Sequence, residues 1–545
     1  MKQFISDKGS YDQFRRERLL ARLDDAGEWD LVVIGGGATG LGVALDAVSR
    51  GYKTLLLEQA DFAKGTSSKS TKLVHGGVRY LAQGNVDLVR EALHERGLLL
   101  RNAPHLVRNQ TFIIPNYEFL KGPFYWIGLK IYDLLAGRLS FGKSEYVSRD
   151  EVLRKVPSLV EAGLYNGIRY HDGQFDDARL ALNVAQTVVE NGGVVLNYMG
   201  VTGLVKDSTG KVTGVAARDM ETSLQYEFKS KAVVNATGVF VNDILEMDDR
   251  DKPPLVRPSQ GAHVVVDRSF LKSDEAIMIP ETSDGRVMFA VPWHSKVILG
   301  TTDLPVGAVS LDPKPMEEEV DYILETAGKY LVRQPRRADV LSIYAGLRPL
   351  AASEGSGAER TKEISRSHKI LVQPSGLVTI TGGKWTTFRK MGEDAVEKVI
   401  AIAGLPAAPS KSAGLLIHGA GQGDGSRGIP QPDDVYGTDR VLINELIAAR
   451  PDLGTKLHPD FEFNQAEVVL AVRNEMARTI EDVLARRVRI LFLDAQAAID
   501  CAPVVAGLLA EELGKDNSWK EHELTRFFAI AKGYLLTEMT FAPHD

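Results

Sequence analysis

An apolar run, Leu31-Val32-Val33-Ile34, leads directly into a glycine-rich segment with the spacing G-x-G-x-x-G, and an amphipathic stretch, residues 41–50, follows it. This order predicts a strand, a tight turn and a helix, and the free N–H groups at such a helix start can bind phosphate. The glycines would allow the turn, the approach of a pyrophosphate to the backbone, and close packing of the helix on the strand. The residues of this predicted dinucleotide-binding turn are Gly35, Gly36, Gly37, Thr39 and Gly40.

An acidic residue follows the turn at the distance expected for ribose binding. Residues 53–57 predict a second strand that ends in Glu58, roughly 20 residues beyond the glycines. A carboxylate at this place accepts hydrogen bonds from ribose hydroxyls. This part of the chain therefore predicts a βαβ unit that binds either NAD or FAD.

Three further segments, far apart in the chain, offer small residues or backbone N–H groups to a ligand. A loop rich in hydroxyls and the residues after it contain the candidates Thr66, Ser67, Ser68, Ser70, Lys72, Leu73, His75, Gly76 and Gly77. The end of a buried strand contains Ala236, Thr237 and Gly238. A second glycine-rich helix start contains Gly382, Gly383, Lys384, Trp385 and Thr386. Contacts this widely spaced favour a long, extended cofactor, so we expect FAD.

The composition excludes several classes of protein. The 545 residues are 44% apolar and 25% charged, as in a soluble globular protein of two to four domains. A net charge of −7 argues against nucleic acid as a partner. The single cysteine, Cys501, excludes a disulfide, a redox-active cysteine pair and a cysteine-ligated metal site within one chain. We therefore expect no metal and redox chemistry on an organic cofactor.

The order of elements predicts an α/β protein with a helical C-terminal part. Strand-like runs dominate the middle of the chain and predict a largely antiparallel substrate layer. The clearest amphipathic stretches near the C-terminus are 474–487 and 495–512. We expect a charged N-terminal extension (1–28), an oxidoreductase domain (29–404), a Gly/Pro-rich linker (405–437) and a helical domain (438–545). Within the second of these, the cofactor part is expected mainly at 29–105, 170–250 and 345–404, and the substrate part at 106–169 and 251–344.

A set of motifs together resembles the FAD-dependent glycerol-3-phosphate dehydrogenase family over about residues 29–400. Besides the segments above, they are 75–80 (HGGVRY), 177–180 (DARL), 300–303 (GTTD), 346–350 (GLRPL) and, in the helical tail, 489–494 (RILFLD). The resemblance implies an FAD-binding Rossmann-like domain of the glutathione-reductase/D-amino-acid-oxidase type, with an interleaved, mostly antiparallel β substrate domain and a C-terminal α-helical cap. It also implies oxidation of sn-glycerol 3-phosphate to dihydroxyacetone phosphate, with the hydride on flavin N5 and electrons passed to membrane quinone.

Cationic side chains among glycines or beside proline suit a small phosphate ester, which needs charge-assisted donors. The candidate substrate-binding residues are Arg79, Tyr80, His263, Arg348, Arg366 and Lys384, with Arg366 resting mainly on the resemblance. Oxidation of a secondary alcohol also needs a base for the hydroxyl proton. We expect His263 in that role, by the family pattern, with Arg348 as the second catalytic residue and His75 as the alternative base.

The acceptor and the location follow from the resemblance and from the lack of a long apolar run. No 18-residue apolar segment and no secretory signal are visible, so we expect a cytoplasmic protein attached peripherally to the cytoplasmic membrane. The aromatic stretch from Phe124 to Leu135 is the candidate membrane contact, with core packing as the alternative reading. A glycerol-3-phosphate oxidase using oxygen and another FAD-dependent amine or amino-acid oxidase remain as alternatives. The oligomeric state is open, with a homodimer among the alternatives.

Overall fold

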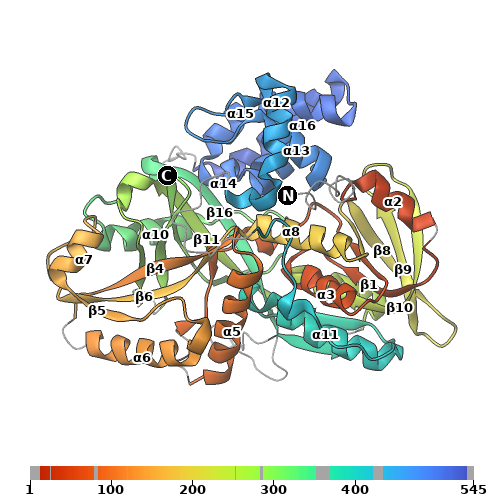
Figure 1. Ribbon diagram of the computed structural model, residues 1–545, viewed down its shortest axis with the longest axis horizontal. Helices are drawn as coiled ribbons and strands as arrows, with labels where there is room; N and C mark the ends of the chain where they lie inside the picture. The colour runs from red at the N-terminus through yellow and green to blue at the C-terminus, as the bar shows by residue number, and fades with distance from the viewer. Residues whose placement is uncertain are drawn as a thin grey trace, which may run out of the picture.

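The structure is a computed structural model that describes residues 13–24, 26–78, 81, 84–118, 121–251, 253–280, 282, 286–351, 368–421 and 434–536. Two sheets lie side by side, and a helical domain formed by the C-terminal part of the chain covers one end of both (Figure 1). The chain crosses between the sheets several times, so each is built from segments far apart in sequence. This α/β architecture with a C-terminal helical domain confirms the expected fold class.

The first sheet is the dinucleotide-binding layer. Its spatial order is β17 (Lys369–Val372), β18 (Val378–Thr381), β10 (Gln225–Asn235), β1 (Trp29–Ile34), β2 (Thr54–Leu57) and β7 (Val194–Leu196), with β8 (Met199–Lys206) and β9 (Val212–Asp219) as a hairpin on β10. Its helices are α2 (Arg16–Asp24), α3 (Ala38–Ser49), α8 (Asp177–Glu190), α9 (Val241–Asp248) and α11 (Phe388–Ala403). Because β1 runs parallel to β2 and β10, their carboxyl ends meet at one edge, where ligands of α/β sheets bind.

The second sheet is mostly antiparallel, as expected for the substrate layer. Its order is β15 (Leu304–Pro305), β11 (Val256–Asp267), β14 (Lys296–Gly300), β13 (Met288–Trp293), β12 (Ala276–Ile279), β4 (Val107–Asn116), β6 (Asn166–Phe175) and β3 (Leu73–Val74), with β16 (Val340–Ala351) on β11 and β5 (Glu145–Ser148) on β6. The helices packed around it are α5 (Val86–Asn102), α6 (Lys121–Ala136), α7 (Arg149–Lys155) and α10 (Glu317–Tyr330).

Several boundaries differ from those expected from the sequence. The whole of β16 pairs with β11, so residues 345–351 lie in the second sheet and not in the cofactor layer, and the same holds for residues 170–175 of β6. Helix α2, expected as an extension, packs on the first sheet, where Arg16 is buried and donates to Asp219. In the expected linker, Leu405, Ile417 and Tyr436 are buried, so its described residues pack as part of the fold.

The C-terminal domain contains α12 (Arg440–Ala449), α13 (Gln465–Glu475), a π-helical turn (Asp482–Arg487), α14 (Ile490–Leu493), α15 (Ala495–Leu513) and α16 (Asn517–Ala531). The single amphipathic helix expected at 474–487 is wrong. The chain leaves α13 at Met476, whose φ of 54° is left-handed, and re-enters helical geometry at Ile480. The polar side chains that looked like a solvated helix face, among them Arg486 and Arg487, are instead buried against carboxylates.

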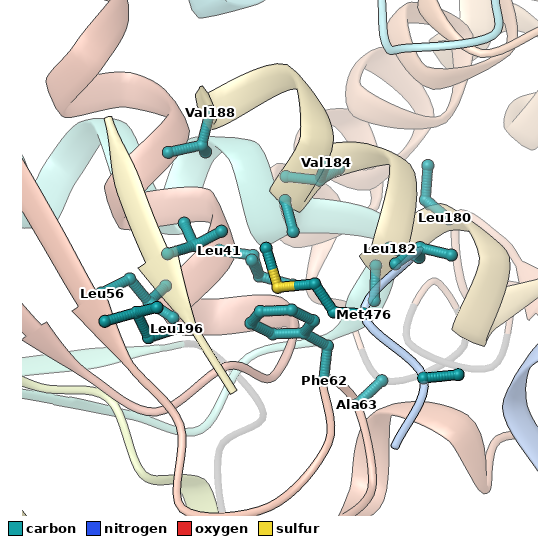
Figure 2. Close-up of a cluster of buried hydrophobic side chains, with 14 of the residues drawn as sticks. Leu41, Leu56, Phe62, Ala63, Leu180, Leu182, Val184, Val188, Leu196 and Met476 are labelled. Atoms are coloured by element: carbon teal, nitrogen blue, oxygen red, sulfur yellow. The ribbon is translucent and has the colours of Figure 1, made fainter. Parts of the chain in front are cut away.

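The two parts of the chain share one hydrophobic core. Figure 2 shows Met476 of the C-terminal domain beside Phe62 and among side chains of α3 and α8, including Leu41 and Val184. All of these side chains are almost completely buried. Burial of one such side chain contributes about 1.5–3 kcal/mol, so the contact fixes the C-terminal domain on the dinucleotide-binding layer.

Among the described helices, none combines the length and the hydropathy that a membrane span requires. On α6, however, apolar side chains face outward: Leu134 is 80% exposed and Ile127 is 55% exposed. This helix lies at the edge of the molecule away from the C-terminal domain (Figure 1). The expectation of core packing holds for Leu129 and Tyr132, which are buried on its inner face.

Candidate active site

One pocket of about 940 Å³ lies between the two sheets and collects most of the sequence-predicted residues. Its volume is near the upper end of the usual range for ligand sites, roughly 300–1,000 Å³. The predicted residues that line it are Gly35, Gly37, Thr39, Glu58, Thr66, Ser67, Ser70, Leu73, His75, Gly77, Ala236, Thr237, Gly238, His263, Arg348, Gly382, Gly383, Lys384, Trp385 and Thr386. The four segments singled out in the sequence therefore meet at one cavity.

The N-terminus of α3 forms one end of the pocket. Gly37 is its N-cap residue and supplies no side-chain hydrogen bond, so the helix start is open to a ligand apart from Ala38 N–H, which donates to Ser67 Oγ at 2.9 Å. Gly35 has a φ of 110°, a value that favours glycine. A Cβ there would also overlap the carbonyl of Ala236, which explains why two strand ends can approach so closely.

Glu58 closes the ribose side of the cradle. Its carboxylate accepts hydrogen bonds from the backbone N–H groups of Gly36 (2.7 Å) and Ala60 (2.9 Å). Burial raises the pKa of Glu58, against the lowering effect of these two bonds. The carboxyl group is thereby fixed at the pocket wall, where it can accept from a hydroxyl of the ligand.

Side-chain to backbone bonds hold the pocket loops together. Trp385 Nε1 donates to the carbonyl of Ser67 at 2.8 Å, and Thr66 Oγ1 donates to the carbonyl of Leu347 at 2.6 Å. His75 N–H donates to Thr386 Oγ1 at 3.1 Å. The hydroxyl-rich loop is thus tied both to the second glycine-rich segment and to β16.

Five residues proposed from the sequence as cofactor contacts do not line the pocket. Gly36 and Gly40 serve packing, because a Cβ would meet Glu58 and Phe62 at the first and the Gly35 carbonyl at the second. Gly76 packs on α5 and α6, and its N–H donates to Tyr132 Oη at 2.8 Å.

The other two are Ser68 and Lys72, and both face the protein interior. Neither is exposed to solvent. The Lys72 ammonium donates to the Ser68 carbonyl and to the Asp177 carboxylate, each at 2.7 Å. These two side chains therefore do not line the cavity, whereas Thr66, Ser67, Lys69, Ser70 and Thr71 of the same loop do.

His263 lies on β11, between its register partners Gly300 and Tyr344. Its Nε2 is 2.9 Å from Thr71 Oγ1, and its ring stacks on the Tyr344 ring, with centroids 4.7 Å apart and planes at 13°. Burial, and secondarily the positive charges of Lys72 and Arg348, hold the pKa of His263 well below its usual range. The low pKa favours the neutral imidazole, the form in which one ring nitrogen is unprotonated.

Arg348 projects from β16 across Gly261 of the neighbouring strand. A Cβ at position 261 would overlap its guanidinium, so glycine provides the space for this side chain. Nη1 lies 3.1 Å from Asp303 Oδ1, and Nη2 donates to Thr301 Oγ1 at 3.1 Å. The guanidinium is held in a fixed orientation at the pocket wall, as recognition of a small anion requires.

Several lining residues were not selected from the sequence. They include Lys69, Thr71, Gly261, Thr301, Asp303 and Arg286. The GTTD motif at 300–303 could have identified Thr301 and Asp303 from the sequence. Thr71, in contrast, is identified only by its contact with His263. The predicted substrate contacts Arg79, Tyr80 and Arg366 lie outside the described residues.

A separate part of the pocket wall is apolar and aromatic. Helix α6 contributes Tyr125, Ile127, Gly128, Leu129 and Ile131, and the adjoining strands contribute Phe112, Tyr170, Met278 and Phe289. Among the described residues, no group of three or more His, Cys, Asp or Glu side chains forms a site for a metal ion.

Two family matches define the class of the protein. Residues 30–389 match the family described as FAD dependent oxidoreductase, and residues 433–520 match the C-terminal domain of alpha-glycerophosphate oxidase. Mitochondrial glycerol-3-phosphate dehydrogenases are similar over nearly the whole chain: that of Rattus norvegicus is 40% identical over 95% of this chain and 76% of its own, and that of Homo sapiens 38% identical over 98% and 77%. The chain belongs to the FAD-dependent glycerol-3-phosphate dehydrogenase family.

Solved structures agree with this assignment. A glycerol-3-phosphate dehydrogenase from Bacillus halodurans, complexed with FAD, superposes with a TM-score of 0.74 at 28% identity and covers 98% of this chain and 100% of its own. Glycine oxidase from Geobacillus kaustophilus (TM-score 0.52, 18% identity, 72% of this chain and 100% of its own) shares the fold alone.

The residues present fit FAD, the cofactor of this family. The open helix start at Gly37 can bind the pyrophosphate, Glu58 can accept from a ribose hydroxyl, and Gly382 and Gly383 bring further backbone to the wall of the cavity. The same cavity continues to His263 and Arg348, so a cofactor and a small substrate can meet within it. The enzyme is an FAD-dependent oxidoreductase.

Proposed function

We propose that the protein oxidises sn-glycerol 3-phosphate to dihydroxyacetone phosphate. The observation that carries this proposal is the joining of a dinucleotide cradle to a buried histidine and a fixed arginine in one cavity. The relatives that are similar over nearly the whole chain are named glycerol-3-phosphate dehydrogenases, and this supports the choice of substrate.

The side chains of the pocket have distinct roles in this reaction. Arg348 and Lys384 bind the phosphate, with Arg79, Tyr80 and Arg366 as further substrate contacts. His263 takes the proton of the C2 hydroxyl, because its depressed pKa keeps the ring neutral before the reaction. When bound, FAD accepts the hydride that leaves C2. The product is a ketone, and the enzyme holds one proton on the histidine.

Membrane quinone is the acceptor that we propose for the electrons. An apolar quinone ring needs an apolar route from the membrane to the cofactor. Helix α6 provides such a route, because Ile127 and Ile131 line the pocket and are also exposed at the surface. Trp126 is exposed on the same helix, and tryptophan side chains are frequent at the level of lipid headgroups. We therefore place the protein on the cytoplasmic membrane, with α6 in contact with the lipid.

The substrate is tested by anaerobic mixing of the yellow holoenzyme with candidate reductants. We expect sn-glycerol 3-phosphate to bleach the flavin absorption, and glycine or L-proline to leave it unchanged. Substitution of His263→Asn should slow this bleaching by about 10²–10⁴-fold if the ring is the base. Bleaching by an amino acid but not by sn-glycerol 3-phosphate would instead identify an amine or amino-acid oxidase.

The acceptor is tested separately, on enzyme already reduced by substrate. Reoxidation by a ubiquinone analogue should be much faster than reoxidation by air-saturated buffer, and hydrogen peroxide should not accumulate in step with substrate. Rapid formation of hydrogen peroxide in proportion to substrate would assign the protein as an oxidase.

A further inference from the structure

Tyr344 of β16 packs against the ring of His263, and the C-terminal domain packs against Tyr344 in turn. The Tyr344 ring lies between the rings of His263 and Phe492: it stacks on the first and meets the second edge-on, with centroids 4.8 Å apart and planes at 73°. Phe492 belongs to α14 and is 1% exposed. A continuous aromatic contact therefore runs from the C-terminal domain to the candidate base.

A cationic contact runs parallel to the aromatic one. The Lys72 ammonium lies 5.2 Å from the ring centres of both Tyr344 and Phe492 and 5.3 Å from that of Trp293. Its charge is balanced by Asp177, which also accepts from Arg489 Nη2 at 2.9 Å. Phe492 thus completes an aromatic enclosure around a buried ammonium, an arrangement that is favourable when water is excluded.

These contacts reach the loop that carries the pocket residues. Arg489 Nη2 donates to the carbonyl of Ser68 at 3.2 Å, and Ser70 Oγ donates to Asp177 at 2.6 Å. The Tyr344 hydroxyl donates to the Ser70 carbonyl at 3.1 Å. Residues 68–70 are consequently fixed from behind, and the next residue, Thr71, is the one that contacts His263 Nε2.

We propose that Phe492 and Arg489 of the C-terminal domain are positioning residues that set the orientation of His263 and of Thr71 from behind the pocket. Neither side chain lines the cavity, so they act through Tyr344 and through the 68–71 segment. An error of about 1 Å in the placement of a reacting group can lower the rate roughly 100-fold, so contacts that fix the position of His263 affect the rate of the reaction. The C-terminal domain would then complete the active site as well as the fold. This inference rests on the proposed role of His263.

The test compares two buried phenylalanines of the same domain. Phe492→Leu removes the ring against Tyr344, whereas Phe527→Leu, at a residue of α16 that is 0% exposed, is the matched control for the loss of a buried ring. We expect Phe492→Leu to lower the limiting rate of anaerobic flavin reduction by about 10–100-fold while the substrate dissociation constant changes little. Phe527→Leu should lower the melting temperature at least as much and leave that rate unchanged.

A second readout does not depend on turnover. In protein labelled with ¹⁵N-histidine, the ring signals of His263, assigned by their loss in His263→Asn, should shift in Phe492→Leu and stay in place in Phe527→Leu. If Phe492→Leu does not fold, Phe492→Met, which keeps most of the volume, replaces it. Wild-type ring signals in the Phe492 variant would overturn the inference. Failure of sn-glycerol 3-phosphate to reduce the wild-type flavin would contradict the proposed function. The comparison of ring signals would still test whether Phe492 orients His263.

Discussion

Arg348 Nη1 lies 3.1 Å from Asp303 Oδ1, and the same carboxylate accepts a hydrogen bond from Ser259 Oγ. Asp303 therefore orients the arginine by a contact that leaves the guanidinium at the pocket wall. The contact with Asp303 holds the long, flexible side chain of Arg348 in one conformation before the substrate arrives.

Arg348→Ala should weaken the use of sn-glycerol 3-phosphate far more than the binding of FAD. One charge-assisted bond to phosphate is worth about 1.5–3 kcal/mol, which corresponds to roughly 10–150-fold in apparent affinity. Asp303→Asn retains the arginine and should cause a smaller loss of the same kind. Substrate titrations followed by flavin reduction give the affinity, and the ratio of visible to ultraviolet absorption gives the cofactor content. Loss of flavin in the Arg348 variant would assign the arginine to cofactor binding instead.

Two glycines of the dinucleotide-binding turn, Gly37 and Gly40, should respond differently to the same substitution. A Cβ at Gly37 would meet only Ser67 Oγ, at 3.1 Å, so Gly37→Ala should fold but place a methyl group where the pyrophosphate must approach. A Cβ at Gly40 would overlap the Gly35 carbonyl, so Gly40→Ala should disturb the packing of α3 on β1. We expect a folded, colourless protein in the first case and a poorly folded one in the second. Circular dichroism and flavin content measure the two effects, and full flavin content in Gly37→Ala would contradict this placement of the pyrophosphate.

The sequence predicted best those features that neighbouring residues determine. The strand before Gly35, the helix after it and the second strand before Glu58 all depend on local pattern, and the structure contains them. Contacts between distant segments could not be predicted from the sequence pattern. No local pattern shows that Ser68 and Lys72 turn inward, because their partners Asp177 and Arg489 come from elsewhere in the chain.

The break within the expected helix 474–487 has the same origin. Charged residues at helical spacing resemble a solvated face, yet the carboxylate of Asp61 accepts from both Arg486 and Arg487 in the buried junction between domains. Buried ion pairs of this kind need a partner fixed in space, which the sequence does not supply. Likewise, Thr71 could be distinguished from its hydroxyl-bearing neighbours only once His263 was placed beside it.

His418 should make stability depend on pH through its two carboxylate partners. Burial alone would lower its pKa, but hydrogen bonds with Asp439 (2.8 Å) and Glu190 outweigh burial and raise the pKa to about 10. Because the pKa is higher in the folded state, the unfolded state loses its proton first. The stabilisation is fully present below about pH 6.5 and is lost as the pH rises towards 10, by up to about 5 kcal/mol.

The measurement is the melting temperature of wild type and His418→Asn from pH 6 to 9.5. We expect the wild type to lose more stability across this range than the variant, and the two curves to converge at high pH. His522→Asn, at an exposed histidine of α16, is the matched control and should follow the wild type. Parallel curves for wild type and His418→Asn would show that the ion pairs do not contribute.

The last prediction concerns the outer face of α6. Trp126 and Leu134 are exposed on this helix and do not line the pocket, so a charge at either position changes the surface without entering the cavity. Full burial of one large apolar side chain contributes about 1.5–3 kcal/mol, so Leu134→Glu and Trp126→Glu should each weaken binding to anionic liposomes by roughly tenfold or more. Val332→Glu, at an apolar residue outside α6 that is 65% exposed, is the matched control. Co-sedimentation measures the binding, and reduction of a long-chain quinone in the same vesicles should fall with it while anaerobic flavin reduction by substrate stays at the wild-type rate. If both α6 variants bind vesicles and reduce the quinone like the Val332 control, the membrane contact lies on another face of the molecule.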